Sequence, residues 1–323
     1  MVTRVVAGIV VHNASHDSSH NPAYNYLFPM FRSLIILLLI TGLGAEATLP
    51  AKKAKSFDPI SMLEVQAIPR RVDEAIAPIL SARSALLMDV DTGIVMVHKN
   101  PEERMPMASL TKIMTAAIIL DSHKLSEVVT VSDDFGSIPE MGVRLWLQQY
   151  ERITVGDLLI GLLVPSAGDA TLALAKYHSG SVEQFVSAMN AKAKELHLLN
   201  THFMNPIGLD EENHYSTALD LAMLARYALR NADFRRIVRM TEATITSTNG
   251  KLSHSFKSTD ELLNSYLDIQ GVKTGTTDDA GQSVINLARN KSGKEVLSVI
   301  LDSPDRFQES KSLIDWSFRN YSW

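Results

Sequence analysis

Ser109-Leu110-Thr111-Lys112 runs directly into the apolar stretch 113–120, a pattern that predicts a buried helix beginning here. Residues three positions apart lie on the same face of a helix, one turn apart. The hydroxyl of Ser109 is therefore expected beside the amine of Lys112, which would pair a nucleophile with its own base. Taken alone, these four residues favour the simpler interpretation that Ser109 caps the helix, because short motifs often recur by chance.

The composition of the chain excludes several classes of function. With 46% hydrophobic and 21% charged residues among 323, the chain is typical of a globular protein with a sizeable core. Its net charge of -5 and its lack of a basic run give no reason to expect nucleic acid as a partner. Since there is no cysteine, disulfides, thiolate catalysis and cysteine-ligated zinc are excluded. The sequence also has no His-Glu-x-x-His zinc motif, so we expect neither a metal nor a cofactor.

Residues 30–47 are typical of a secretory signal peptide. Arg32 precedes the apolar run 34–40, and the small residues of Ala45-Glu46-Ala47 fit a cleavage site. The apolar run is too short to span a bilayer comfortably. An uncleaved anchor is the alternative, because only one positive charge precedes the run.

The sequence before this signal fits poorly with export, so we expect translation to start at Met30 rather than at the first residue. We predict a leader over 1–47, made of an extension over 1–29 and the signal peptide. A single catalytic domain is expected over 48–323. The leader would send the protein across the inner membrane to the periplasm, and contact with the membrane is expected only through an uncleaved leader.

The first half of the predicted domain contains a hairpin followed by helices. Two apolar strands over 84–97 flank the turn signal Asp91-Thr92-Gly93. The region of about 109–239 is mainly helical in pattern, with apolar residues at helical spacing over 155–163 and 185–198.

The last third of the chain returns to strands and ends in a helix. Three β-rich runs are separated by glycine and aspartate clusters, and they cover 266–272, 283–288 and 295–301. An apolar-periodic stretch over 307–318 predicts a closing helix. This order predicts an α+β fold, in which an antiparallel sheet is built from both ends of the chain and a mainly helical region is inserted between them.

Two further motifs change the interpretation of Ser109. Pro165-Ser166-Ala167-Gly168 follows a helical pattern, and Gly271-Val272-Lys273-Thr274-Gly275-Thr276 stands at the end of a predicted strand. Together with the first motif, they resemble the S-x-x-K, S-x-N and K-T-G signatures of the serine penicillin-recognising enzymes. The likeness is greatest to the low-molecular-mass penicillin-binding proteins, which are D-alanyl-D-alanine carboxypeptidases and endopeptidases. It runs from about Ser84 to the C-terminus and includes the segments 104–115 and 201–209.

This resemblance implies a β-lactamase/transpeptidase-like fold and an acyl-enzyme formed on Ser109 by peptidoglycan stem peptides. β-Lactam antibiotics are the implied covalent inhibitors. The backbone N–H groups of Ser109 and Thr276 would form the oxyanion hole. Ser166 would relay a proton between Lys112 or Lys273 and the leaving amine. The implied catalytic residues are Ser109, Lys112 and Ser166, and the implied substrate-binding residues are Lys273, Thr274, Gly275, Thr276 and Gly168.

A lysine is a base only when it is neutral, and a free lysine has a pKa near 10.4. Burial at the start of an apolar helix and the nearby cation of Lys273 would both lower the pKa of Lys112. The positive end of the helix dipole acts in the same direction. We also expect structural hydrogen-bonding roles, rather than catalytic ones, for His202 and His214.

The chain departs from the family pattern at two places. Gly168 stands where the family usually has an asparagine, whose amide would bond to the substrate and to the lysine base, so water or Asp169 would have to substitute. The sequence also stops at Trp323, whereas carboxypeptidases of this group often continue into a β-rich domain and an amphipathic anchor. The second departure suggests a periplasmic form nearer to the endopeptidase branch.

Two other functions stay open at this point. A class A β-lactamase shares the fold and the nucleophile but adds a glutamate in a Glu-x-x-Leu-Asn pattern. The near matches at Glu195 and Glu261 each miss that spacing by one residue, so we expect slow deacylation of penicillin. A non-catalytic scaffold or sensor is favoured by Gly168 alone. Carboxypeptidase, endopeptidase and transpeptidase activities share the acyl-enzyme and are not separated by the sequence.

Overall fold

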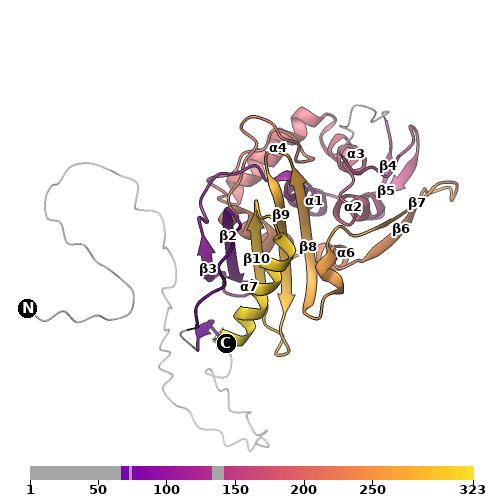
Figure 1. Ribbon diagram of the computed structural model, residues 1–323. Helices are drawn as coiled ribbons and strands as arrows, with labels where there is room; N and C mark the ends of the chain where they lie inside the picture. Colours follow the sequence, from indigo (N-terminus) through magenta and orange to yellow (C-terminus); the bar gives the residue numbers. More distant parts are fainter. Residues whose placement is uncertain (1–66, 73–74, 133–141) are drawn as a thin grey trace, which may run out of the picture. The chain divides into compact units, whose positions relative to one another are not determined.

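An antiparallel sheet of five strands, in the order β3-β2-β10-β9-β8, forms the centre of the described fold (Figure 1). The bounds of these strands, in chain order, are β2 Ser84–Asp89, β3 Val95–Lys99, β8 Asp268–Thr277, β9 Gly281–Arg289 and β10 Glu295–Leu301. Strand β10 pairs with β2, with Ser84 opposite Leu301 and Asp89 opposite Val296. The sheet is therefore built from both ends of the domain, as the sequence predicts.

The computed structural model describes residues 67–72, 75–132 and 142–323, all within one compact unit. The leader predicted over 1–47 lies outside the described residues. A short pair of strands, β1 (Arg70–Arg71) and β11 (Tyr321–Ser322), joins the two ends of the described chain.

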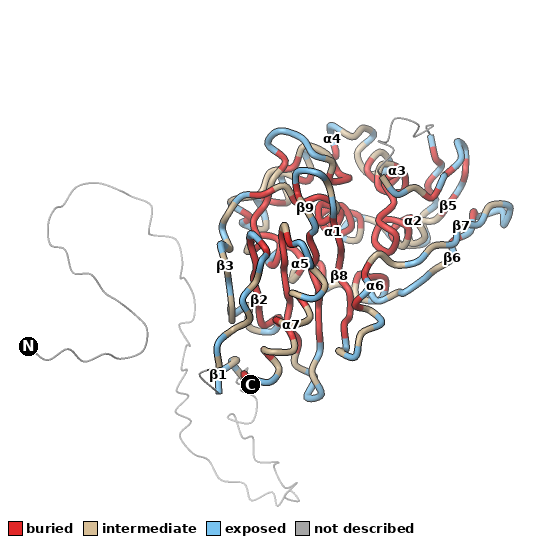
Figure 2. Tube along the Cα trace, in the orientation of Figure 1, coloured by how far each residue is buried: buried red, intermediate tan, exposed pale blue. Residues whose placement is uncertain are grey.

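Helices cover both faces of the sheet, so its inner strands, such as β10, are buried on both sides (Figure 2). Along β2, Leu86 packs into the core shared with α1 (Lys112–Ser122) and α5 (Ala218–Ala228). The next residue, Leu87, points to the opposite face and packs in the cluster that contains Leu313 of α7 (Arg306–Asn320). This alternation is the ordinary result of strand geometry. It explains why β10 has the near-continuous apolar sequence from which it was predicted.

The helical region contains most of the remaining elements. They are the 3-10 helix η1 (Ala108–Thr111), α2 (Val155–Leu163), α3 (Gly168–Ser179), α4 (Val182–Glu195) and α6 (Ala232–Val238). The prediction of 185–198 for α4 was three residues late at both ends. The side chain of Ser181 accepts the N–H of Gln184 and so fixes the start of the helix.

Besides β1 and β11, two further pairs of short strands and one 3-10 turn were not predicted. The pairs are β4 (Val128–Thr130) with β5 (Arg152–Thr154), and β6 (Glu242–Thr246) with β7 (Ser253–Lys257). The turn is η2 (Glu261–Asn264). Strands β6 and β7 alternate between two faces: exposed threonines and serines bond across the ribbon on one face, and Ile245 and Phe256 lie on the other.

Strand β8 is longer than the sequence predicts. It was expected to end at 272, but it continues to Thr277, because its pairing with β9 runs on from Lys273 opposite Ile285 to Thr277 opposite Gly281. An irregularity near Gly271, which has a φ of 99°, interrupts the pairing before this point. The whole Lys-Thr-Gly motif therefore lies within an edge strand.

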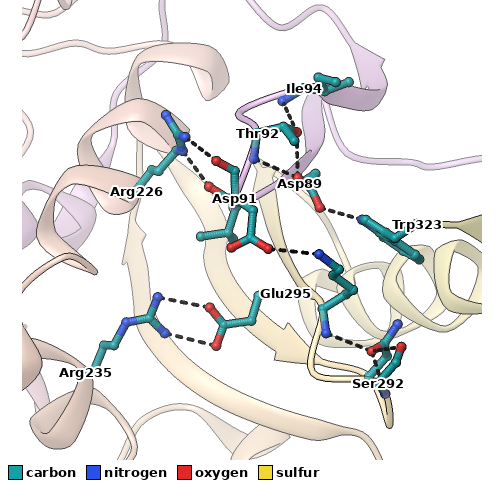
Figure 3. Close-up of polar contacts among 12 residues, drawn as sticks. Asp89, Asp91, Thr92, Ile94, Arg226, Arg235, Ser292, Glu295 and Trp323 are labelled. Atoms are coloured by element: carbon teal, nitrogen blue, oxygen red, sulfur yellow. Dashed lines mark hydrogen bonds and ion pairs between the residues drawn. The ribbon is translucent and has the colours of Figure 1, made fainter. Parts of the chain in front are cut away.

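The turn between β2 and β3 is held by a polar network (Figure 3). The carboxylate of Asp89 accepts the backbone N–H of Thr92 at 2.8 Å and the indole N–H of Trp323 at 2.6 Å. From α5, Arg226 donates to the backbone oxygens of Val90 and Asp91. The predicted hairpin is thus confirmed, and it is tied to both the helical region and the C-terminus.

Candidate active site

Ser109 and Lys112 lie side by side at the start of α1. Ser109 is the second residue of η1, and Lys112 is the first residue of α1. The amine of Lys112 donates a hydrogen bond of 2.9 Å to the hydroxyl oxygen of Ser109. The capping alternative is not what the structure contains, because α1 begins after Thr111 and the Ser109 side chain is bonded to the lysine instead.

The Lys112 amine is buried, with 1% of the residue exposed, and its second bond goes to the backbone oxygen of Ile207 at 2.7 Å. Burial lowers the pKa of Lys112 well below its usual range, and the charge of Lys273 lowers it further. The direction and both causes agree with the sequence prediction. A neutral amine that donates to Ile207 has a lone pair available for the Ser109 proton.

Ser166 is a buried residue in a strained conformation. Its φ of 70° lies in the left-handed region, which side chains other than glycine rarely adopt. Its hydroxyl oxygen has no hydrogen-bond partner among the described residues. Strain and an unsatisfied buried hydroxyl together are typical of a functional position. The predicted contact of Ser166 with either lysine is not present as a direct hydrogen bond in the described part of the chain.

Gly168 and Asp169 begin α3 and bind the loop at 143–147. The N–H of Gly168 donates to the oxygen of Val143, and the Asp169 carboxylate accepts the N–H groups of Leu145 and Leu147. The suggestion that Asp169 replaces the missing asparagine was therefore wrong, because its oxygens are already used to hold this loop.

Strand β8 brings the third motif to the nucleophile. Lys273 is 1% exposed, and its amine donates to the backbone oxygen of Thr274 at 3.1 Å. Burial lowers the pKa of Lys273 to about 7; the negative charge of Asp260 opposes this shift, and Arg306 adds to it. A Cβ at Gly275 would stand 3.0 Å from the backbone nitrogen of Ser109. The absence of a side chain therefore lets β8 approach the nucleophile segment itself, as well as any substrate.

Thr274 and Thr276 differ in exposure. The hydroxyl of Thr274 is buried against Thr259, whose N–H donates to the oxygen of Val164, two residues before Ser166. The middle motif and β8 are thereby linked through one residue. Thr276 is exposed, so its side chain is accessible to a ligand.

Arg306 and Asp260 belong to the site but were missed from the sequence. Arg306, the first residue of α7, donates to the backbone oxygen of Gly275 at 2.7 Å and to the hydroxyl of Thr276 at 2.5 Å. The Asp260 carboxylate accepts from Asn286 at 2.7 Å, and burial raises its pKa to about 6. Neither residue stands in a recognisable motif, and only the folded chain brings them to β8.

The two histidines have structural roles, as predicted. His214 accepts the N–H of Met204 with Nδ1, and Nε2 lies 2.8 Å from the Thr111 hydroxyl. Burial lowers the pKa of His214 to about 4, so the neutral ring donates to Thr111. His202 bonds to the backbone oxygen of Asn213.

The described segments contain no group of three or more side chains able to hold a metal ion. Within them, no helix is long and apolar enough to cross a membrane.

The sequence profile of the D-alanyl-D-alanine carboxypeptidases matches residues 71–305. The chain belongs to this family. The D-alanyl-D-alanine carboxypeptidase DacF of Bacillus subtilis is 35% identical over 248 residues, which are 74% of this chain and 63% of that protein. DacC of Escherichia coli is 34% identical over 256 residues, which are 75% of this chain and 62% of that protein. The chain thus spans less than two thirds of the length of these carboxypeptidases.

Solved structures confirm the predicted fold class. The Streptomyces K15 DD-transpeptidase is similar with a TM-score of 0.70 and 29% identity, covering 76% of this chain and all of that one. Penicillin binding protein 5 from Haemophilus influenzae has a TM-score of 0.71 and 30% identity, covering 77% of this chain and 74% of that one. The β-lactamase/transpeptidase-like α+β architecture is therefore established for this member of the carboxypeptidase family.

The β-lactamase alternative is not favoured. Its two near-match glutamates, Glu195 and Glu261, are both exposed, at the end of α4 and at the start of η2. Glu195 is paired with Lys192 on the surface of α4.

Proposed function

We propose that this protein is a serine D,D-peptidase that acts on peptidoglycan stem peptides, as a D-alanyl-D-alanine carboxypeptidase or a D,D-endopeptidase, and that β-lactams inhibit it covalently. The observation that carries the proposal is the 2.9 Å bond between the Ser109 hydroxyl and the amine of Lys112, whose pKa is lowered by burial. Family membership and the arrangement of β8 beside this pair support it.

Substrate binding begins with the terminal carboxylate of the peptide. The cation of Lys273, the guanidinium of Arg306 and the exposed hydroxyl of Thr276 line the same stretch of β8. A guanidinium bonded to both Gly275 and Thr276 is well placed to bind a carboxylate there. Thr274 contributes by holding the strand to Thr259 rather than by exposure.

Acylation follows from the position of the two first-motif residues. Lys112 takes the proton of Ser109, and the oxygen attacks the carbonyl carbon between the two D-alanines. The resulting oxyanion would be stabilised by the N–H groups of Ser109 and Thr276. The N–H of Ser109 belongs to the first turn of η1, where backbone donors have no intrahelical acceptor.

The leaving amine must then receive a proton. The hydroxyl of Ser166 is buried, unbonded to any described residue, and held by a strained backbone, which supports its assignment as the relay. Release of D-alanine, or of the cross-linked partner peptide, leaves an ester on Ser109. Water hydrolyses this ester and regenerates the serine.

The location of the enzyme belongs to the same proposal. We propose that the signal peptide over 30–47, within the leader 1–47, carries the domain over 48–323 out of the cytoplasm, where cell-wall peptides are available. Sequencing the N-terminus of the mature protein from its own cells tests the cleavage, and sequencing the N-terminus of the uncleaved precursor tests the start at Met30.

Mass spectrometry after incubation with benzylpenicillin tests the central proposal. A stoichiometric adduct on Ser109 is expected, and Ser109→Ala should show none. A folded wild-type protein without an adduct would instead indicate a non-catalytic scaffold.

Digestion of isolated peptidoglycan then separates the activities, because a carboxypeptidase releases free D-alanine and an endopeptidase cleaves cross-links.

A further inference from the structure

The turn at 205–209 is organised by a single side chain. The Asn205 side-chain oxygen accepts three successive backbone N–H groups, from Ile207 at 3.2 Å, Gly208 at 2.7 Å and Leu209 at 3.0 Å. The Asn205 side-chain nitrogen donates to the backbone oxygen of Leu209 and to the carboxylate of Glu211, each at 3.1 Å. Both ends of the amide are therefore used to fix one conformation of the turn.

The turn packs directly on the nucleophile segment. Gly208 has a φ of 92°, and a Cβ there would lie only 1.9 Å from the backbone oxygen of Ala108, the residue before Ser109. The oxygen of Pro206 accepts the Thr115 hydroxyl from α1 at 3.1 Å. The turn is thus held on the nucleophile segment at Pro206 and at Gly208. The peptide group between these two residues, which follows Ile207, has little freedom to move.

That peptide group carries the backbone oxygen of Ile207, which accepts from the Lys112 amine at 2.7 Å. A neutral amine has two N–H groups and one lone pair. In the structure the amine also donates to Ser109, so to act as a base it must turn until its lone pair, rather than an N–H, faces the hydroxyl. Keeping one N–H on a fixed oxygen limits this rotation to the few orientations that point the lone pair or the other N–H at Ser109. The position of the Ile207 oxygen therefore affects how well Lys112 acts as a base.

The Ile207 carbonyl is more important for orienting the Lys112 amine here than in a protein that carries the asparagine of the middle motif. Gly168 has no side chain with which to contact the lysine, and Asp169 binds the loop at 143–147 instead. In the described part of the chain, the hydrogen bonds of the Lys112 amine go to Ser109 and Ile207.

We propose that Asn205 is a positioning residue for the base Lys112, acting through the backbone oxygen of Ile207. This inference rests on the proposed acylation of Ser109. In this protein the turn at 205–209 orients the Lys112 amine, a role that the asparagine replaced by Gly168 would otherwise share.

The test compares Asn205→Ala and Asn205→Asp with Asn190→Ala. Asn190 is a matched control because it bonds both the N–H and the oxygen of Phe203, at the start of the same segment, without touching the turn at 205–209. The readouts are the thermal midpoint and the rate of acylation by benzylpenicillin, per folded molecule, measured from pH 5 to pH 10.

For Asn205→Ala we expect the plateau rate at high pH to fall about 10- to 100-fold, as is typical for a base displaced by a fraction of an ångström to 1 Å. Asn205→Asp keeps an oxygen acceptor for the three N–H groups, but it loses the bonds to Leu209 and Glu211 and places a second carboxylate beside Glu211. Its plateau should therefore recover only part of the rate. The added negative charge favours the ammonium form of Lys112. The pH at which the acylation rate falls off on the acid side should therefore be higher in this variant. Asn190→Ala should lose thermal stability but keep its plateau rate within about threefold.

Wild-type acylation rates for Asn205→Ala, or an equal loss of rate in Asn190→Ala, would each overturn the inference. If Asn205→Ala does not fold, Asn205→Asp decides alone, since an acid limb at its wild-type position would contradict a link between this turn and Lys112. Failure of the proposed function is distinguishable, because the wild-type protein itself would then not be acylated.

Discussion

Gly275 and Ser109 are in backbone contact: a Cβ added to Gly275 would stand 3.0 Å from the backbone nitrogen of Ser109. The same Cβ would also lie 3.0 Å from the Cβ of Ala108. Strand β8 and the nucleophile segment can therefore approach this closely only because position 275 has no side chain. The oxyanion hole proposed above takes one N–H from each of these two segments, so its width depends on that contact.

Gly275→Ala should widen the hole without unfolding the domain. The backbone atoms around the new methyl group must shift by a few tenths of an ångström. We expect the acylation rate with benzylpenicillin to fall about 10- to 100-fold, comparable to loss of part of an oxyanion hole. Stopped-flow acylation together with the thermal midpoint measures both effects. Gly250→Ala is the control for the acylation rate, because no atom lies within 4 Å of the place that its new methyl group would take. Its φ of 72° should lower the thermal midpoint without changing acylation. Equal acylation rates in both variants would contradict the assignment.

Arg306→Leu should weaken the binding of substrates that carry a carboxylate. Loss of a charged hydrogen bond is worth about 1.5–3 kcal/mol, so the second-order acylation rate is expected to fall about 10- to 100-fold. Arg319→Leu is a matched control, since Arg319 lies on the same helix, is largely exposed and pairs with Asp315. An acylation rate unchanged in Arg306→Leu would show that Lys273 and Thr276 bind the carboxylate without it.

Lys273→Met should change how stability depends on pH. The pKa of Lys273 is about 7 in the folded protein and near 10.4 when unfolded, so between these values the unfolded chain holds a proton that the folded chain lacks. The wild-type free energy of unfolding should therefore rise with pH above 7, by up to about 1.4 kcal/mol per unit from this group.

The variant lacks this contribution, while Lys112 contributes in the same direction to both proteins. Urea unfolding at pH 7, 8 and 9 should show the wild-type protein gaining stability relative to Lys273→Met at each step. If the free energy of unfolding changes equally with pH in the two proteins, Lys273 keeps its proton in the folded state.

Asp169→Ala should release the loop at 143–147. Removing the carboxylate leaves the buried N–H groups of Leu145 and Leu147 without their acceptor, at a cost of about 1–3 kcal/mol for each unsatisfied group. Asp233→Ala is the comparison, because Asp233 is also an acid in the first turn of a helix but is only half-buried and is bonded to Arg236. We expect a lower thermal midpoint and faster proteolysis within 143–147 only for Asp169→Ala. Equal effects in both variants would reduce the role of Asp169 to a favourable charge at a helix start.

Local patterns in the sequence were sufficient for the elements whose structure is determined locally. The spacing of Ser109 and Lys112 predicts their contact because η1 and α1 hold residues three apart on one face. The bounds of α2 and β10 were also predicted, since both are strongly apolar runs with clear ends. The lowered pKa of Lys112 followed from the same apolar surroundings.

Features that depend on distant contacts could not be found in this way. Arg306 is separated from Gly275 and Thr276 by two strands and has the appearance of an ordinary charge at a helix start. The contact of Ile207 with Lys112 uses a backbone oxygen, which leaves no trace in residue type. The role of Asp169 was misjudged because its partners are backbone groups of a loop that is adjacent only in the folded chain.

The pairing of Ser84 with Leu301, near opposite ends of the domain, has a consequence for the time at which the chain becomes reactive. Such pairing closes a very long loop before its contacts form, so folding is expected to be slow. Lys273 lies on β8, which is joined to the rest of the sheet through β9 and β10. Until these last strands dock, Lys112 lacks both its full burial and the neighbouring cation, which together lower its pKa. We therefore expect a growing or partly folded chain to be much less reactive than the finished domain.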